Sequence, residues 1–412
     1  MKIMPINIIP FFSSIASPCL IDTHSRYLLE SGARVIKPDD FMGTKKREAD
    51  LLTQQNIIFV GTGGTENKVA DFIRENDLRS PIIIMSHPSN NSLPASMEIR
   101  AYLDKNGFPA ALIHLPLDGL VMKLRRWVEF SEHLEMLRKS RIGLIGKPSF
   151  WLIASDIDFE KATNRWGVAF EKFDLSVLKT EATITTANSI ESEFKAGSSK
   201  IEIPATEIEK ASRVAAVLND FIQEHHLRAV TLQCFDYLVE TEVSGCLALS
   251  HVNNQPGQTA GCEGDIPTTF TMLLARILTG SPSFMANVID VDLENNAAVF
   301  AHCTVATSLV KNYEITTHFE TGKSVGIRGS FEKERVTVFK VFGDELLDYW
   351  VSGGTIEENL REEECCRTQI RVNLDEDVSY FLDESLANHH VIIPGDHAEI
   401  IEDFFSYVYL RE

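Results

Sequence analysis

Short apolar runs alternate with amphipathic segments over the first third of the chain. The runs NIIFVG (56–61), PIIIMSH (81–87) and AALIHLPL (110–117) each have the length and composition of a buried strand. Between the first two lies TENKVADFIREN (65–76), which reads as an amphipathic helix. Strand, helix and strand in this order predict a parallel sheet with helices on its faces.

A second unit of the same kind follows a polar helical connector over residues 124–140. It begins with the strand and turn RIGLIGKP (141–148) and continues through a long predicted helix, residues 207–226. A further buried strand, AVTLQCF (229–235), comes next. This order again predicts strands that lie parallel in one sheet.

From about residue 286 the pattern changes to alternating β runs separated by Gly, Asn and Asp. We expect strands at FMANVIDVD, NAAVFAHCTVA, KSVGIRGSF, RVTVFKVFG, TQIRVNL and HHVIIPG. The sequence therefore predicts an α/β protein in which two Rossmann-like α/β domains, 1–140 and 141–285, precede a β-rich, barrel-like domain, 286–412.

Composition limits the classes of function. The 412 residues carry a formal charge of −20, which argues against a nucleic-acid partner and against docking on anionic lipid. No uninterrupted apolar run reaches the length of a membrane span. Pro5 and Pro10 interrupt the apolar N-terminal run, which favours a first buried strand over a signal peptide. Seven cysteines without a framework spacing fit reduced thiols in a cytoplasmic protein.

A glycine-rich stretch, GTGGTE (61–66), stands at a strand-to-helix turn. It lacks the spacing of the dinucleotide fingerprint, and no P-loop lysine follows. We interpret it as a tight turn, and a nucleotide-dependent enzyme built on it ranks below the alternatives given next.

The segment GCEGDIPTTFTMLLARILTG (261–280) places Glu263 and Asp265 between glycines directly before a strongly apolar helix. Acids at a helix start complement the exposed backbone N–H groups and the positive end of the dipole, so a surface cap is one interpretation. The other is that the helix start holds the acids for chemistry.

Metal-capable side chains recur in the last third of the chain beside glycine turns and strand ends. They are Glu263, Asp290, His302 and the pair His389–His390. Each has a structural explanation: Asp290 on a solvated strand face, His302 as a satisfied core histidine, and the histidine pair as a polar edge. Carboxylates and imidazoles together suit Mn²⁺ or another divalent ion, and paired cysteine motifs for structural zinc are missing from the sequence.

The last 150 or so residues resemble the L-fucose isomerase and L-arabinose isomerase superfamily, both in the residues of several segments and in the order of those segments along the chain. The matching segments are GCEGDIPTTFTMLLARILTGSPSFMANVIDVD, FAHCTVA, HFETGKSVGIRGSFEKERVTVFKVFG and NHHVIIPGDHAEIIEDFF. Members interconvert aldoses and ketoses with a divalent metal. The N-terminal halves agree in architecture without a comparable motif. The chain is also shorter than the founding isomerases, which puts the sugar in question.

The resemblance implies a metal set of Glu263, Asp290, His302 and His390. Glu263 corresponds to the acid at a helix mouth that binds metal and exchanges protons, and Asp290 to the second catalytic acid. His302 corresponds to a histidine near the metal in the arabinose branch, and His390 to the C-terminal histidine ligand of both branches.

Four further residues complete the predicted site. Asp265 and His389 are expected to orient the ligands. Lys323 and Arg328, in the hairpin GKSVGIRG, are candidates for contacts with substrate oxygens, but the ordinary surface charge of a hairpin is the favoured interpretation.

The implied reaction moves a proton between C1 and C2 of a sugar through a cis-enediol. A divalent metal stabilises the negative charge, and two carboxylates alternate as base and acid. A non-catalytic sugar-binding or regulatory protein on the same fold is the competing hypothesis. By the same resemblance we expect a homo-oligomer, a trimer or hexamer, in which a neighbour's N-terminal domain helps to close each site.

Overall fold

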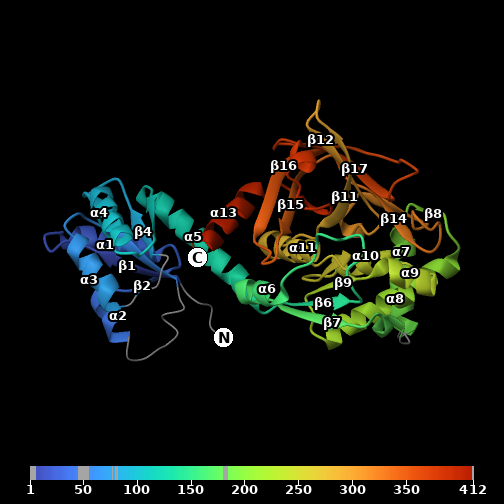
Figure 1. Ribbon diagram of the computed structural model, residues 1–412, viewed down its shortest axis with the longest axis horizontal. Coiled ribbons are helices and arrows are strands. Elements are labelled where there is room, and N and C mark those ends of the chain that lie inside the picture. The colour runs from blue at the N-terminus through green and yellow to red at the C-terminus, as the bar shows by residue number, and fades with distance from the viewer. Residues whose placement is uncertain (1–5, 45–54, 77, 79–81, 180–183, 411–412) are drawn as a thin grey trace. The chain divides into compact units, whose positions relative to one another are not determined.

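The computed structural model describes residues 6–44, 55–76, 78, 82–179 and 184–410. The chain divides into two compact units, and Figure 1 shows the elements of each. Unit 1 comprises Met1–Glu135 together with Glu402–Glu412, and unit 2 comprises Met136–Ile401.

Unit 1 is built on a five-stranded parallel sheet in the order β2-β1-β3-β4-β5. Its strands are β1 (Asn7–Phe11), β2 (Arg34–Val35), β3 (Asn56–Val60), β4 (Ile82–Ser86) and β5 (Ala110–His114). Its helices are α1 (Pro18–Leu29), α2 (Pro38–Thr44), α3 (Glu66–Asn76) and α4 (Ser92–Lys105). Helix α5 (Leu117–Arg138) begins in this unit, and α13 (Ala398–Tyr409) ends in it.

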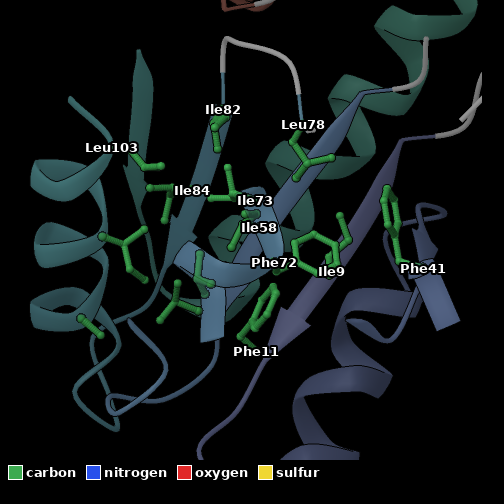
Figure 2. Packing of buried hydrophobic residues seen from close by; sticks show 14 of the residues in the cluster. Ile9, Phe11, Phe41, Ile58, Phe72, Ile73, Leu78, Ile82, Ile84 and Leu103 are labelled. Carbon is green, nitrogen blue, oxygen red and sulfur yellow. The ribbon is translucent and has the colours of Figure 1, made fainter. Parts of the chain in front are cut away.

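The core of unit 1 lies between the sheet and its helices, as Figure 2 shows. Strand residues Ile9, Ile58 and Ile84 are fully buried there. The ring of Phe72, on α3, packs edge-on against Phe11, with the ring centres 5.3 Å apart. Each such side chain contributes about 1.5–3 kcal/mol by leaving water, which explains why continuous apolar runs form these strands.

Unit 2 contains a second parallel sheet of four strands in the order β10-β9-β6-β7. These strands are β6 (Arg141–Ile145), β7 (Ala169–Phe173), β9 (Ala229–Leu232) and β10 (Thr259–Cys262). The accompanying helices are α6 (Phe159–Trp166), α7 (Ile184–Gly197), α8 (Ala205–Glu224), α9 (Cys234–Thr241), α10 (Cys246–Asn254) and α11 (Ile266–Thr279), with a 3₁₀ turn at Leu175–Lys179.

The other part of unit 2 is a closed antiparallel barrel in the order β11-β12-β17-β16-β15-β18, drawn in orange and red in Figure 1. Its strands are β11 (Phe284–Asp292), β12 (Ala297–His302), β15 (Arg335–Phe342), β16 (Asp348–Asn359), β17 (Thr368–Leu374) and β18 (His390–Pro394). A three-stranded sheet joins β8 (Lys200–Ile201), β13 (Asn312–Thr316) and β14 (Gly326–Ser330). The 3₁₀ turn Thr307–Leu309 and helix α12 (Tyr380–Asp383) complete the unit.

Helix α11 is buried around its whole circumference, unlike the amphipathic helices of unit 1. Its 14 residues follow the acids singled out in the sequence, and it packs against strands of the parallel sheet and of the barrel. Among the helices of the described residues, none combines the length and the apolar character needed to cross a membrane.

The predicted α/β class, with parallel sheets and a terminal barrel, is confirmed. Six strands escaped prediction: β2, β7, β8, β10, β13 and the long β16. Strand β16 contains the pair Gly353–Gly354, which interrupts the apolar alternation, and a Cβ at either position would meet atoms of β17 or its following turn. The boundary at residues 285 and 286 stays a prediction, since the second sheet and the barrel belong to one compact unit.

Candidate active site

Glu263 occupies a tight turn between strand β10 and helix α11. Its backbone has a φ of 62°, in the left-handed region, and Gly264 follows with a φ of 68°. A Cβ on Gly264 would lie 2.4 Å from the carbonyl oxygen of Lys147, so only glycine fits beside that neighbouring loop. The turn therefore directs the Glu263 side chain away from both elements, at the carboxyl edge of the parallel sheet.

Asp265 is the N-cap of α11. Its Oδ1 accepts a hydrogen bond from the Thr268 backbone N–H at 2.8 Å, and its Oδ2 accepts one from the Thr268 hydroxyl at 2.8 Å. The cap interpretation is thus correct for Asp265 and does not apply to Glu263. The two acids are only two residues apart, but the turn points their side chains in different directions. Asp265 therefore caps the helix, and Glu263 does not.

Three buried side chains from different elements meet in front of this turn. They are Glu263, His302 at the end of β12, and His389 immediately before β18. Their nearest ligand atoms all lie within 4.8 Å of one another, and among the described residues no other such group of three metal-capable side chains occurs. Glu263 Oε1 lies 3.7 Å from His302 Nε2 and 3.6 Å from His389 Nε2.

The two Nε2 atoms are buried and have no hydrogen-bond partner. The other nitrogen of each ring is held in place: His302 Nδ1 by the Thr304 hydroxyl at 2.9 Å, and His389 Nδ1 by Asp265 Oδ2 at 2.9 Å. A buried polar atom without a partner is costly unless something binds it. Two imidazole nitrogens and a carboxylate aimed at one point form a donor set that fits a divalent metal ion.

A buried ion-pair network supports the cluster from beneath. Lys340, on β15, is fully buried, and its Nζ donates to the Thr268 hydroxyl at 2.7 Å. Burial by itself raises the pKa of Asp265, but the charge of Lys340 and the hydrogen bond from His389 prevail and lower that pKa to about 2. Asp265 is therefore ionised and fixes the ring of His389 through Nδ1.

The electrostatics of the cluster follow from burial and from paired charge. Burial raises the pKa of Glu263, but the two histidines beside it outweigh that effect and hold the pKa well below its usual range. For His389, burial lowers the pKa, while Asp265 and Glu263 raise it to a net value of about 9. The cluster therefore attracts positive charge.

A cavity of about 140 Å³ opens in front of the cluster. Its lining combines Glu263 and His302 with aromatic, amide and thiol side chains: Trp151, Phe235, Asn287, His318, Glu320, Asn388, Cys234, Cys246, Cys262, Cys303 and Cys366. Trp151 Nε1 donates to Glu263 Oε2 at 2.6 Å, and the rings of Trp151 and Phe235 meet edge to face at 4.8 Å. The site thus offers both polar groups and flat apolar surfaces.

His390, the predicted metal ligand, does not belong to the cluster; its neighbour His389 does. His390 Nε2 contacts the Tyr380 hydroxyl at 3.0 Å and its Nδ1 the Asn388 carbonyl at 3.0 Å, among barrel aromatics. Burial and the charge of Lys340 lower its pKa to about 3. Successive side chains at a strand point to opposite faces, so only one of the two histidines can reach Glu263.

Asp290, the predicted second acid, also lies apart from the cluster. It is exposed on β11, accepts a hydrogen bond from the Val291 N–H at 2.9 Å, and lines a different hollow with Phe381. The pairing of β11 with β12 shifts register between Val288 and Asp290. Asn287, before that shift, lines the cavity instead, and the exposed position of Asp290 agrees with the interpretation of VIDVD as a solvated strand face.

Lys323 and Arg328 have acidic partners outside the cavity. Lys323 Nζ lies 2.5 Å from Glu242 Oε1 on the surface. Arg328 Nη1 lies 3.1 Å from Glu314 Oε2 and 3.7 Å from Glu202 Oε2. Neither side chain lines the cavity. The surface-charge interpretation describes Lys323, whereas Arg328 is half-buried in an ion pair with the buried Glu314.

The glycine turn GTGGTE has a packing explanation in unit 1. A Cβ on Gly61 would lie 2.2 Å from the ring of Phe12, and one on Gly63 would lie 2.8 Å from Cβ of Asn91. Thr62 Oγ1 accepts a hydrogen bond from the Ser13 N–H at 2.7 Å. These contacts agree with the tight-turn interpretation.

Sequence reasoning missed several residues of the site. Trp151 lies outside every motif. Asn287 and Lys340 stand inside segments that carry the family resemblance, but each follows an ordinary strand pattern there. Glu320 and His318 stand in HFETG, inside a segment that carries the family resemblance, and that segment was the available signal. Burial, together with the charge of Glu263, raises the pKa of Glu320, so this carboxyl holds a proton more readily than an isolated one.

Comparison with known proteins gives a consistent result. No family model matches the chain. The sulfoquinovose isomerase of Priestia aryabhattai is 23% identical over 318 residues, which cover 72% of this chain and 69% of the relative. The sulfoquinovose isomerase of Clostridium sp. (strain MSTE9) is 22% identical over 242 residues, 54% of this chain and 52% of the relative. The relatives are sugar isomerases, and the chain resembles them over most of its length.

Proposed function

We propose that the protein is a metal-dependent aldose–ketose isomerase that acts on a monosaccharide. The observation that carries the proposal is the buried group Glu263, His302 and His389, with two unpartnered Nε2 atoms aimed at the same point as a carboxylate. The sulfoquinovose isomerases among its relatives support the reaction class.

Glu263, His302 and His389 would hold a divalent ion, with Mn²⁺ as the first candidate. When bound, such an ion supplies Lewis-acid stabilisation of negative charge on neighbouring sugar oxygens. Asp265 keeps the Nδ1–H of His389 directed at itself, so that Nε2 would present its lone pair once a bound ion has displaced the second ring proton. This assignment replaces the predicted ligands Asp290 and His390.

The chain's carboxylates would move the proton. Isomerisation takes a proton from one carbon and returns it to the neighbouring carbon, which a pair of acid–base groups accomplishes through a cis-enediol. Glu263 is ionised and would accept the proton, the role that the family resemblance implies. Glu320 lines the same cavity with a raised pKa and suits the second role, which we had assigned to Asp290.

The aromatic rings support a sugar as substrate. Trp151 and Phe235 present flat apolar faces at the cavity, and Asn287 and Asn388 present amides that can bond hydroxyl groups. Because the relatives carry the name sulfoquinovose isomerase, sulfoquinovose is the first sugar to test, followed by L-fucose and L-arabinose.

We further propose a homo-oligomer, trimeric or hexameric, on the family resemblance stated above. Light scattering on the purified chain measures the mass directly. A fully active monomer would remove this part of the proposal and leave the reaction unaffected.

The test is a panel of aldoses and ketoses incubated with purified protein and Mn²⁺, with product followed by NMR. We expect interconversion of one aldose–ketose pair, loss of turnover after treatment with a chelator, and recovery when Mn²⁺ is restored. Saturable sugar binding without turnover, unaffected by the chelator, would instead support a non-catalytic sugar-binding protein.

A further inference from the structure

Five of the seven cysteines line the single cavity at the candidate active site: Cys234, Cys246, Cys262, Cys303 and Cys366. All seven are free thiols. Cysteine packs well as a small apolar residue, so burial alone does not set these thiols apart. What distinguishes Cys234 and Cys262 is the short distance between their sulfur atoms.

The sulfur atoms of Cys234 and Cys262 lie 2.8 Å apart. A disulfide bond is about 2.05 Å long, so the two sulfurs need to approach by only about 0.8 Å, the difference from 2.8 Å. Both side chains line the cavity, which gives a small oxidant access to them.

The backbone holds the pair together. Cys262 ends β10 opposite Leu232, the last residue of β9, and Cys234 begins α9 two residues later. The N–H of Gly264 donates to the Leu232 carbonyl at 3.0 Å, and the Thr231 hydroxyl donates to the Cys262 carbonyl at 3.3 Å. These bonds connect the two chain segments that carry the thiols.

We propose that Cys234 and Cys262 are an oxidative modification site, at which hydrogen peroxide or a small organic peroxide closes an intramolecular disulfide. The sulfur of one thiol attacks the peroxide and becomes a sulfenic acid, and the first oxygen leaves as water. The second thiol displaces the sulfenic oxygen, which also leaves as water. Two thiols are oxidised, and one peroxide is reduced to two waters, or to water and an alcohol.

The disulfide has a direct effect on the proposed isomerase site. Cys262 precedes Glu263, so drawing its sulfur towards Cys234 moves the turn that directs the carboxylate at His302 and His389. A displacement of about 1 Å at a catalytic group lowers rates on the order of 100-fold. This consequence rests on the proposed function, whereas formation of the disulfide does not.

The disulfide is tested on the full-length protein carrying Cys19→Ser, because Cys19 is exposed and would oxidise between molecules. The reduced protein is treated with hydrogen peroxide, alkylated, and digested with a Glu-specific protease that cuts after Glu240 and Glu242. We expect a cross-linked peptide that joins Cys234 to Cys262, absent after reduction with dithiothreitol. Phenylarsine oxide, which bridges neighbouring thiols, should protect Cys234 and Cys262 together from alkylation.

Matched serine variants separate the pair from the other thiols. Cys246→Ser removes a thiol that lines the same cavity and should leave both the cross-link and the arsenical binding in place. Cys234→Ser should abolish the cross-link and the arsenical protection of Cys262. Cys262→Ser is the second variant and should have the same effect on Cys234, and the melting curve of each variant checks that it is folded.

Other outcomes have defined meanings. A disulfide at Cys303–Cys366, or peroxide consumption without any cross-link at Cys234, would overturn the proposal. If the Cys234–Cys262 disulfide is mapped and is reversible but the protein has no isomerase activity, the proposed modification site stands and the proposed function is rejected. With activity present, we expect reversible loss of turnover on the order of 100-fold in the oxidised protein.

Discussion

The carboxyl edges of the two parallel sheets place buried histidines in opposite electrostatic situations. In unit 1, His24 and His87 lie with ring centres 4.7 Å apart, packed against the rings of Phe12 and Phe59. In unit 2, His389 lies between Glu263 and Asp265. His24 and His389 are 3% and 1% exposed, so burial does not distinguish them.

The pKa shifts of these histidines differ in sign. Burial and the neighbouring His87 both lower the pKa of His24, to about 4. Burial also lowers the pKa of His389, yet its two carboxylate neighbours raise that pKa to a net value of about 9. Desolvation disfavours charge in both places, and only a buried counter-charge reverses it. At the carboxyl edge of a parallel sheet, the buried histidines are therefore part of apolar packing in unit 1, whereas in unit 2 they belong to a candidate cation site.

The largest expected effect is that of Glu263→Gln, which removes the carboxylate that makes unit 2 different. Turnover should fall at least about 100-fold and stay low at saturating Mn²⁺, the scale of general acid–base catalysis. Steady-state kinetics with metal titration measures this. Glu320→Gln is the companion variant, expected to reduce turnover while Mn²⁺ affinity is retained. Normal turnover in Glu263→Gln would mean that the turn is only structural.

Asp265→Asn should have the next largest effect, because it keeps the shape of the cap and removes the charge that fixes His389. Loss of such a supporting carboxylate typically lowers metal affinity about 10- to 100-fold. Isothermal titration with Mn²⁺ checks the prediction. Thr304→Val removes the hydroxyl that contacts Nδ1 of His302. Its Mn²⁺ affinity, measured in the same way, is the matched comparison for the other histidine of the cluster. Unchanged affinity in Asp265→Asn would exclude the positioning role.

Unit 1 should lose stability in acid because of its neutral histidines. The folded pKa of His24 is about 4, below its value in the unfolded chain. The unfolded state therefore binds more protons between pH 6.5 and pH 4, so stability is complete above about pH 6.5 and falls towards pH 4. His24→Phe should reduce this loss by on the order of 1–2 kcal/mol at pH 4.

Denaturant titrations of the two proteins at several pH values measure that difference. Tyr27→Phe, at an exposed position on the same helix as His24, changes no group that titrates in this pH range; it is the control and should leave the pH dependence as in the wild type. An equal effect of both variants would contradict the role given to burial.

The smallest effect is expected from Asp290→Asn, at the exposed position outside the cavity. Turnover and Mn²⁺ affinity should stay within about twofold of wild type, as is usual for surface substitutions of this kind. Comparing it with Glu263→Gln in one assay tests which acids belong to the site. A large loss of turnover in Asp290→Asn would support the original assignment of Asp290 as a catalytic acid.

The regular strands could be predicted because each buries a continuous or alternating apolar face. Strand β3 was expected at 56–61 and occupies Asn56–Val60. Strand β16 was not predicted, since Gly353 and Gly354 supply no apolar side chain to the pattern. The barrel nevertheless needs this strand, because it pairs with both β15 and β17. Closure of a sheet is a long-range requirement that a local window does not contain.

The sequence by itself determined the α/β class, the change to β structure near residue 286, and the turn at Glu263, where glycines and acids before an apolar helix are a local signal. Only the tertiary structure decided that His389 and not His390 joins Glu263 and His302, that Asp290 faces solvent, and that Lys340 lies beneath Asp265. The reason is geometric. Which side of a strand reaches a site depends on register and on bulges set by distant partners, and a single residue of shift exchanges the two faces.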